Sequence, residues 1–496
     1  MHVSKRLRIR SFATIATSLT TFSLILISLV LTCSQPANAL PAFARKYGLR
    51  CSACHESWPM LNYFGQKFKD NGYQLMNDRD APIWQNPGYW PVTFRITPIW
   101  HRLSTNENVD TYSSVGGVST VTGNSIERVT STGFDLSGLD FHTGGTLEKN
   151  ISFYVLPSSD PTGAFHFESV MGRLDNMFGS SWLNIKLGKF ELDNLLSEKR
   201  ILTLTGNGGI YQTYHFIPVG DGNIFGQIGD NQLGLEWLGH SADDRTRVSA
   251  ALISSNDGNV GLTLGSNSYN GFFTASQAFD AGKLGVERLG FYAMYGDAAT
   301  YYRTSGGIPI PGSGIGNKSF SREGFVGQLY FTRHFDVQIV TQHGQDNAWF
   351  GQGYGNAVAT DGNGGTTCVG TPGSMGCPPD NTPGTTLPAG ARAPSWNGAT
   401  FEAHYVYSPQ LIFIGRYELE RMSQQSTVGM PGNLGNVTNY VIGYRYNPFM
   451  TSRAGFAWHN EFNVFHQDGT GPTSPITGAA TDLTVSELLL GFDFDF

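Results

Sequence analysis

The end of the chain carries the pattern that most constrains its fold. From Leu488 to the terminal Phe496 every second residue is Leu or Phe, whereas Gly491, Asp493 and Asp495 lie between them. Successive side chains of a β-strand point to opposite faces, so this segment has one apolar face and one mixed face. Such a strand fits a sheet that faces apolar surroundings on one side and polar ones on the other.

Segments of about ten residues with the same alternation recur from about residue 89 onward. Pairs of them flank the short turns 332–335, 408–410 and 243–245, and another precedes Asn447-Pro448. A soluble β-sandwich shows similar alternation, but a last strand that ends in Phe resembles the insertion signal of bacterial outer-membrane barrels. We therefore expect an all-β, porin-like transmembrane β-barrel over residues 89–496. Its length suits about 16 antiparallel strands, with 14 or 18 as alternatives.

The composition agrees with a barrel and excludes several other classes. Charged residues make up 14% and aromatic residues 13% of the chain, and the formal charge is −7. A nucleic-acid-binding protein normally carries a basic surplus, so we expect no nucleic-acid partner. A disordered chain would contain fewer aromatic residues. A polytopic helical membrane protein needs repeated apolar runs of about 20 residues, and only one long run is present.

That single apolar run lies at the N-terminus. Basic residues between Lys5 and Arg10 precede the uncharged stretch 12–31, and Ala37-Asn38-Ala39 follows as a small-x-small cleavage pattern. This order is typical of a signal peptide, which we assign to residues 1–39. An uncleaved membrane anchor is the alternative. We expect an exported protein of the bacterial outer membrane, with lipid as a partner and its loops at the cell surface.

The strongest chemical motif follows the signal peptide directly. Cys51, Cys54 and His55 form C-x-x-C-H, the attachment pattern of a c-type haem. Two thiols at this spacing can bond to the two vinyl groups of one porphyrin, and the adjacent His becomes the proximal iron ligand. A thioredoxin-like pair lacks its βαβ context, and a zinc site lacks a second pair of ligands. Because the motif occurs once, we expect one haem c per chain.

The residues around the motif predict a small α-helical monohaem cytochrome c domain over residues 40–88. Ser57 can cap a helix that Asn71-Gly72 ends, and Gly65 would let the backbone approach a flat ring closely. So short a domain cannot build an adequate core, and we expect the haem to be that core. The predicted apolar face of the helix consists of Leu61, Phe64 and Phe68.

The distal ligand of the haem iron is less constrained by the sequence. Met76 follows the predicted helix, far enough from His55 for the chain to fold back, and we favour it. Met60 and His101 are the alternatives. Ligation by His and Met would raise the reduction potential of the haem.

The remaining candidate residues lie in loops. Residues 345–398 are rich in Gly, Pro, Thr and Asn, and they contain Cys368 and Cys377. Outside the cell these two cysteines would form a small disulfide loop, with a surface metal or redox thiol pair as the alternative. The carboxylates are scattered, as in Asp160, Glu168 and Asp175, so no preformed iron site is predicted.

Residues 41–73 resemble the N-terminus of a known family, the fused outer-membrane cytochrome–porins of iron-oxidising bacteria. The family pattern P-x-F-A-R-x-x-G-x-x-C-x-x-C-H matches from Pro41 to His55, and P-x-L-x-x-F-G-x-x-F-K-x-x-G-Y matches from Pro59 to Tyr73. Lys46-Tyr47 and Trp58 depart from it. The resemblance implies a single-haem domain lodged in or against an outer-membrane barrel, with Fe(II) as the electron donor.

A porin needs no haem, and a soluble cytochrome needs no barrel. Their fusion favours an outer-membrane electron conduit from an extracellular donor through one c-type haem to a periplasmic electron carrier. Its activity would be that of an iron(II):cytochrome c oxidoreductase working by outer-sphere transfer, an assignment that the sequence leaves uncertain. The alternative is a diffusion porin with a haem-containing plug or sensor domain. A surface adhesin would leave the haem unexplained.

Overall fold

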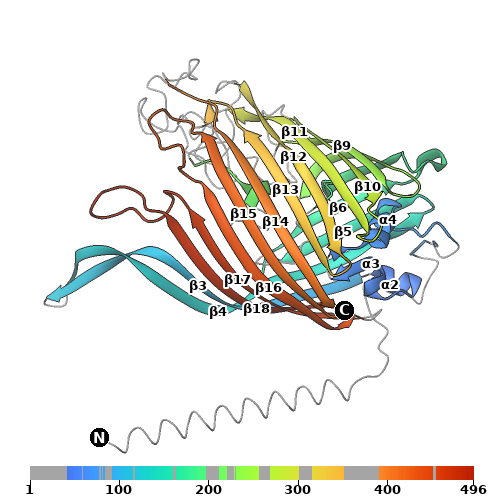
Figure 1. Cartoon of the computed structure of the whole chain (residues 1–496), viewed down its shortest axis with the longest axis horizontal. Coiled ribbons are helices and arrows are strands. Elements are labelled where there is room, and N and C mark those ends of the chain that lie inside the picture. The colour runs from blue at the N-terminus through green and yellow to red at the C-terminus, as the bar shows by residue number, and fades with distance from the viewer. Residues whose placement is uncertain are drawn as a thin grey trace, which may run out of the picture.

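The computed structural model describes most of the chain between residues 42 and 495. The described residues are 42–57, 60–77, 80, 82–83, 92–115, 118–159, 163–196, 212–219, 228, 231–255, 269–300, 316–350, 390–450 and 454–495. They form a closed β-barrel with short helices at one end (Figure 1). None of the described helices is long and apolar enough to cross a membrane.

Sixteen strands make up the barrel. Neighbours in sequence pair antiparallel all the way round, and β18 closes the sheet on β3. The strands are β3 (Val92–Val115), β4 (Val118–Glu148), β5 (Ile151–Ser159), β6 (Phe165–Leu174), β7 (Asn184–Glu191), β8 (Asn231–His240), β9 (Thr246–Ser254), β10 (Tyr269–Asp280), β11 (Val286–Thr300), β12 (Gly316–Thr332), β13 (Phe335–Gln345), β14 (Ser395–Ser408), β15 (Leu411–Gln424), β16 (Val437–Met450), β17 (Gly455–Gln467) and β18 (Leu483–Asp495). The predicted antiparallel barrel of about 16 strands is confirmed.

The wall is apolar outside and polar inside, as the alternation predicts. In β18, Phe492 is exposed on the outer surface, whereas Asp493 and Glu487 are buried on the inner face. In β15, Phe413 is exposed and Arg416 is buried. This arrangement reverses that of a soluble protein, because lipid rather than water surrounds the outside of such a barrel.

The connections differ between the two ends of the barrel. Turns such as 332–335, 408–411 and 240–246 are short at the end where β12, β14 and β8 finish, and we call it the short-turn end. At the other end, the long-connection end, the strands are joined mostly by longer segments. The alternating segment that precedes Asn447-Pro448 belongs to β16, which continues to Met450 with a register shift between Tyr446 and Phe449.

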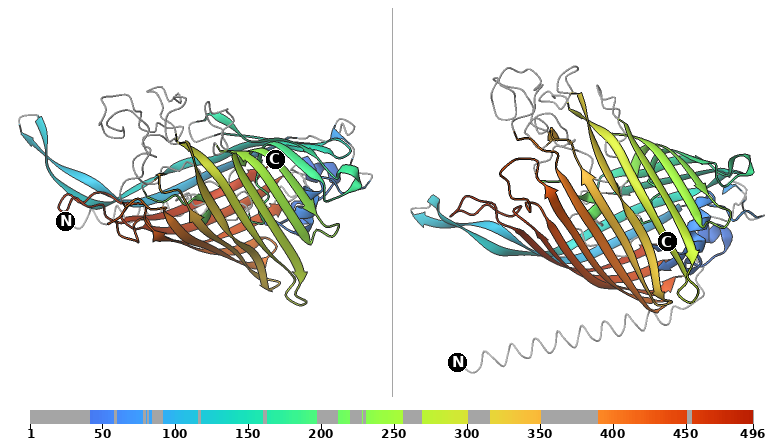
Figure 2. Two further views of the ribbon diagram at one scale, coloured as in Figure 1. Left: turned by 90° about the horizontal axis from the view of Figure 1, so that it is seen from above. Right: turned by 45° about the horizontal axis from the view of Figure 1, so that its top comes forward.

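The N-terminal segment consists of short elements at the short-turn end of the barrel. They are α2 (Ala42–Tyr47), α3 (Cys51–Cys54), β1 (His55–Ser57), β2 (Met60–Leu61) and α4 (Tyr63–Asp70). The two views of Figure 2 and that of Figure 1 place these helices at one end of the barrel. We call the described residues from 42 to 83 the plug.

The helix predicted after the motif begins later than expected. Its N-cap is Asn62, whose side chain accepts a hydrogen bond from the Gly65 amide, whereas Ser57 belongs to β1. The predicted end at Asn71-Gly72 is confirmed, since Asn71 is the C-cap and Gly72 has a φ of +72°. The predicted apolar face is wrong in part: Phe68 is buried, but Phe64 is exposed and Leu61 lies in β2.

The apolar residues of the plug pack together with those of the barrel wall. Tyr47, Phe68 and Tyr73 share one buried cluster with Phe190 and Ile253 on the inner face of the barrel. Phe43 stacks on Tyr73 with ring centroids 4.7 Å apart. The plug therefore buries its apolar side chains against the wall, which supplies the surface that so short a segment lacks.

A second inner element belongs to the connection between β7 and β8. The short helix α5 (Gln212–His215) contacts β13, β14 and β15, from which β9–β12 separate it in the barrel order. The Gln212 amide donates to Glu418 Oε1 at 2.8 Å, and Gln342 Nε2 donates to the Thr213 carbonyl at 2.7 Å. This connection therefore crosses the lumen. A 3-10 turn, η2 (Met177–Gly179), lies between β6 and β7.

Candidate haem-attachment site in the plug

The C-x-x-C-H motif forms a single helical turn followed by an extended residue. Cys51 and Cys54 are the first and last residues of α3, so both side chains belong to one turn. His55 leaves the helix with φ −119° and ψ 138° and pairs with Leu61 in β2. The chain thereby presents two thiols and an imidazole in immediate succession.

Neither Cys51 nor Cys54 forms a disulfide in the structure. Burial raises the pKa of the Cys51 thiol to about 12 and that of the Cys54 thiol to about 11. They are therefore neutral at pH 7 and uncommitted to a disulfide. No group of three or more metal-ligating side chains within the described residues includes either cysteine, so the zinc alternative gains no support there.

The donor set fits a c-type haem. Two thiols one helical turn apart, neither in a disulfide, suit the two thioether bonds, and an imidazole one residue later suits the iron. Cys51 and Cys54 would hold the porphyrin, and His55 would bind the iron on the proximal side.

Gly65 makes a close contact that the sequence did not predict. A Cβ atom at this position would lie 2.1 Å from the Cys54 carbonyl oxygen, so the glycine allows α4 to cross the motif backbone. Asn62 strengthens this contact. Its backbone N–H donates to the Cys54 carbonyl at 2.9 Å, and its side-chain Nδ2 donates to the Ala53 carbonyl at 3.0 Å. The close approach is between two segments of backbone.

The three candidates for the distal ligand lie in different places. Met76 is 54% exposed, and its sulfur lies 3.9 Å from Asn176 Nδ2, between β6 and β7. Met60 is buried, with Gln338 Nε2 3.2 Å from its sulfur. His101 belongs to β3 and faces Glu487 at 3.7 Å. The structure does not bring these three residues together, and ligation by Met76 stays a prediction.

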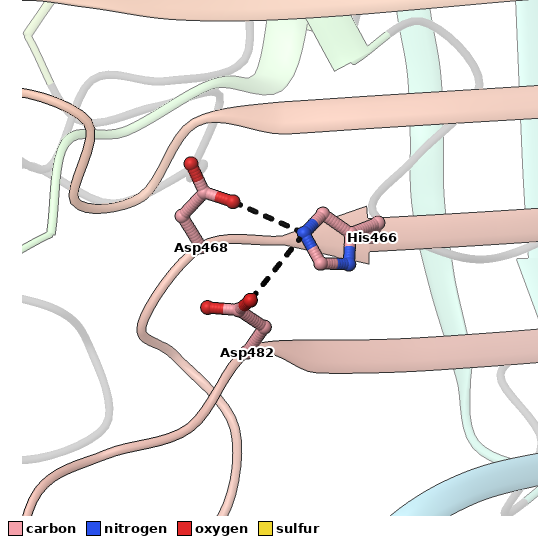
Figure 3. A group of neighbouring side chains, drawn as sticks. All are labelled: His466, Asp468 and Asp482. Atoms are coloured by element: carbon pink, nitrogen blue, oxygen red, sulfur yellow. Dashed lines mark hydrogen bonds and ion pairs between the residues drawn. The ribbon is translucent and has the colours of Figure 1, made fainter.

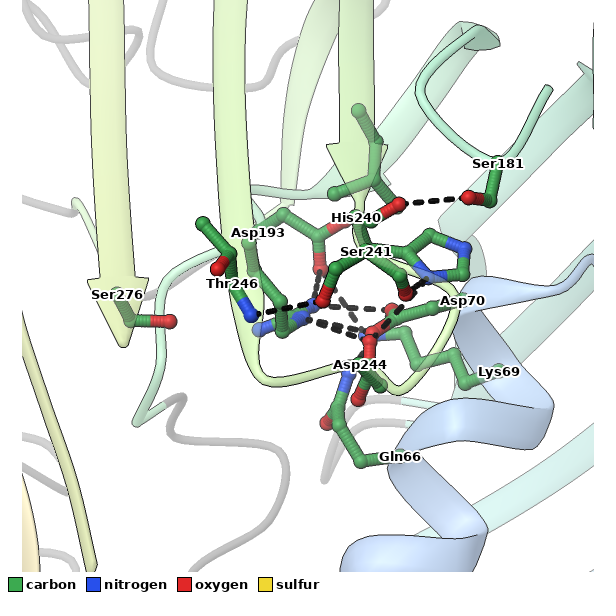
Figure 4. Close-up of polar contacts among 12 residues, drawn as sticks. Gln66, Lys69, Asp70, Ser181, Asp193, His240, Ser241, Asp244, Thr246 and Ser276 are labelled. Atoms are coloured by element: carbon green, nitrogen blue, oxygen red, sulfur yellow. Dashed lines mark hydrogen bonds and ion pairs between the residues drawn. The ribbon is translucent and has the colours of Figure 1, made fainter. Parts of the chain in front are cut away.

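Buried charges fix one side of the plug to the wall (Figure 4). Asp70 is fully buried and forms two hydrogen bonds with Arg247 of β9, at 2.6 and 2.9 Å. Burial alone would raise the pKa of Asp70, but the charge of Arg247 brings it below its ordinary value of 3.8. Lys69 adds contacts with Glu191 at 3.2 Å and Asp193 at 3.7 Å.

The side next to His55 is held by different strands. Glu56 accepts a hydrogen bond from Tyr330 of β12 at 2.7 Å, and Ser57 accepts one from Asn447 of β16 at 3.0 Å. On a third side, Lys46 Nζ donates to Thr146 of β4 at 2.8 Å. The plug therefore touches the inner wall at strands distributed around the barrel.

Sequence reasoning missed one group of ligating side chains. His466, Asp468 and Asp482 meet at the long-connection end, where β17 ends and β18 begins (Figure 3). The spacing His466-x-Asp468 was visible in the sequence, but only the pairing of β17 with β18 brings Asp482 to it. Of the acids singled out in the sequence, Asp175 pairs with Arg173 at 2.8 Å beside the plug.

Other predictions fall on residues that the structure does not describe. These are the signal peptide 1–39, Cys368 and Cys377 with most of the 345–398 loop, Asp160 and the terminal Phe496.

Comparisons with known proteins returned neither a matching family model nor a matching curated relative. Among solved structures, the outer membrane channel DcaP of Acinetobacter baumannii aligns with a TM-score of 0.44 at 10% identity, over 82% of this chain and 97% of that one. The anion-selective porin of Comamonas acidovorans gives 0.44 at 9% identity, over 82% and 98%. OmpT of Vibrio cholerae gives 0.42 at 9%, over 82% and 98%. The resemblance is to the barrels of outer-membrane porins, and it does not bear on what this chain does.

Proposed function

We propose that this chain is an outer-membrane electron conduit. It takes electrons from an extracellular donor, Fe(II) in the favoured case, and passes them to a soluble periplasmic cytochrome. The observation that carries the proposal is the position of the C-x-x-C-H motif in a plug that contacts the inner wall through β4, β9, β12 and β16. A segment anchored on so many sides would obstruct solutes without obstructing electrons.

The location in the outer membrane rests on the surface of the barrel. Exposed aromatic and aliphatic side chains, among them Phe325, Ile442 and Trp458, cover the outside of a closed sheet without free edges. Short turns face the periplasm in such barrels, which would place the plug on the periplasmic side and the 345–398 loop outside. An epitope in that loop should be detected on intact cells; detection only after permeabilisation would invert the topology.

The residues of the plug have distinct parts in the proposed function. A haem held by Cys51, Cys54 and His55 would supply an iron that accepts and releases one electron. Asn62 and Gly65 fix α4 against the motif, and Asp70 fixes α4 to Arg247 of the wall. Ser52 and Tyr63 are exposed next to the motif, which leaves it open to a periplasmic partner.

The decisive experiment is anaerobic addition of Fe(II) to the oxidised, purified protein. We expect the sharpened α-band of ferrous haem within seconds. Dithionite is the control, because it reduces an accessible haem whatever the physiological donor is. If dithionite reduces the protein and Fe(II) fails at every pH from acid to neutral, the donor assignment is wrong and only the conduit remains.

A diffusion porin with a haem-containing plug is the second candidate. The polar inner face of the wall favours it, because porins have such a face, although Glu402, Arg416 and His459 are themselves buried. The two candidates differ in ion flow. A conduit closed by its plug should show a small conductance in planar bilayers, whereas a porin-like conductance of the intact protein would favour the second candidate.

A further inference from the structure

His466, Asp468 and Asp482 point toward one another at the rim of the long-connection end (Figure 3). His466 Nε2 lies 3.0 Å from Asp468 Oδ1 and 3.7 Å from Asp482 Oδ2, and the ligating atoms of all three residues lie within 4.8 Å of one another. From these contacts we infer a binding site for one divalent first-row transition-metal cation.

The separations between the side-chain atoms fit shared coordination. Two ligands about 2.1 Å from one metal are about 3.0 Å apart at a right angle and about 3.4 Å apart at the tetrahedral angle. The observed 3.0 and 3.7 Å lie close to these values, so small side-chain rotations bring all three atoms to one ion. Three protein ligands leave the remaining positions to water.

Hydrogen bonds from neighbouring segments hold Asp482 and the backbone of Asp468 in place. The Gly469 amide donates to Asp482 Oδ1 at 2.9 Å, which directs Oδ2 toward the imidazole. Asn106 Nδ2 donates to the Asp482 carbonyl at 2.8 Å and ties this residue to β3. The Asp468 amide donates to the Asn436 carbonyl at 2.9 Å.

The charge of the cluster favours a cation. Within the described residues, no Lys or Arg forms an ion pair with Asp468 or Asp482, and both carboxylates face the same imidazole nitrogen. One imidazole with two carboxylates is a mixed nitrogen and oxygen set, which suits Fe²⁺, Mn²⁺ or Zn²⁺ better than Ca²⁺ or Mg²⁺. The side chain of Asp482 is 55% exposed, so a hydrated ion can reach the site from solvent.

The site does not rest on the proposed electron transfer. It lies at the opposite end of the barrel from Cys51 and Cys54, and cation binding needs no haem. An imidazolium bridging two carboxylates is the competing description of the same contacts, and metal titration separates the two.

The test is a titration of the full-length purified protein with Mn²⁺. Binding is measured as the loss of the electron paramagnetic resonance signal of the free ion. We expect one Mn²⁺ per chain, with affinity weakened at least about tenfold by Asp482→Asn or by Asp468→Asn. Asp110→Asn on the exposed β3–β4 hairpin is the matched control and should bind as the wild type does. His466→Gln should remove the ¹⁴N coupling of the bound ion.

Two results would overturn the site. Absence of Mn²⁺ binding at millimolar concentration would leave an ion pair, and unchanged affinity in both aspartate variants would place the ion elsewhere. Heat-dependent gel mobility shows whether each variant barrel is folded. Because the titration does not depend on the haem, Mn²⁺ binding without Fe(II) oxidation would remove Fe(II) as the electron donor and keep this site.

Discussion

The barrel wall and the plug are held by different kinds of contact. The wall depends on backbone pairing between neighbouring strands, whose side chains alternate between lipid and lumen. The plug depends on a few contacts with residues far away in sequence, such as Asp70 with Arg247, 177 positions later, and Glu56 with Tyr330, 274 positions later. The wall is therefore a repeated local pattern, whereas the plug is a set of particular partners.

This difference has a consequence for stability. A barrel tolerates the loss of one side chain because its backbone hydrogen bonds remain. A buried ion pair tolerates such a loss poorly, because the partner is left as an uncompensated charge. Substitutions in the plug should therefore release the plug before they affect the barrel.

The largest effect is expected when the haem attachment is removed. Cys51→Ala combined with Cys54→Ala should abolish haem staining of the mature band on a denaturing gel, because no thioether bond can form. The barrel should still show heat-dependent gel mobility, since the wall does not use the motif. Cys368→Ala combined with Cys377→Ala is the matched control and should keep the stain. A stain that survives in the motif variant would mean that the motif was misinterpreted.

The next largest effect concerns the ion pair that anchors α4. Asp70→Asn leaves Arg247 buried, with Asp193 at 3.5 Å as a remaining partner, and should weaken plug docking by about 3 kcal/mol. A fluorophore on an introduced cysteine, Asn77→Cys, would report release of the plug in urea through its anisotropy. The conductance in planar bilayers should rise at the same time.

Asp243→Asn provides the control for that experiment. Asp243 lies in the adjacent turn, is mostly exposed and faces Arg245 at 3.6 Å, so its loss should leave the docking of the plug unchanged. Equal urea midpoints for Asp70→Asn and Asp243→Asn would show that the buried pair does not anchor the plug.

The same contrast explains what the sequence could predict. Alternation is local, so the strands around the 332–335 turn and in β18 could be located from sequence alone, as could the approximate strand number. The C-x-x-C-H motif is also a local pattern, so it too could be recognised from the sequence alone. The partners of the plug were not predictable, because nothing near Asp70 indicates Arg247. The misplaced helix start has a similar cause: Ser57 is a good cap by residue type, but Asn447 of the wall engages its hydroxyl group.

A smaller effect is expected from the buried amine of α2. Burial lowers the pKa of Lys46 from 10.5 to about 8, against a smaller opposing effect of Asp80. Below pH 8 the amine is charged in both the docked and the released plug, so its burial opposes docking. Between pH 8 and 10.5 the released plug binds more protons than the docked plug, so docking should strengthen as the pH rises.

The urea midpoint of the Asn77→Cys reporter, measured at about pH 7.5, 9 and 10.5, follows this change. Lys46→Met should flatten the profile. Lys283→Met in the turn between β10 and β11 is the control and should leave the rise intact. A flat profile in the unaltered protein would mean that Lys46 titrates as an exposed amine does.

The smallest effect on stability, and the sharpest spectroscopic one, is expected at Met76. This side chain is 54% exposed and has a φ of +59°, so Met76→Ala removes little packing. If Met76 ligates the iron, the variant should lose the weak charge-transfer band of Fe(III)–Met ligation and shift to a lower potential. Met430→Ala, an exposed methionine between β15 and β16, is the control and should keep the band. An unchanged spectrum in Met76→Ala would exclude this residue as the ligand. The same substitution would then be made at Met60, which contacts Gln338 of β13, and at His101 of β3.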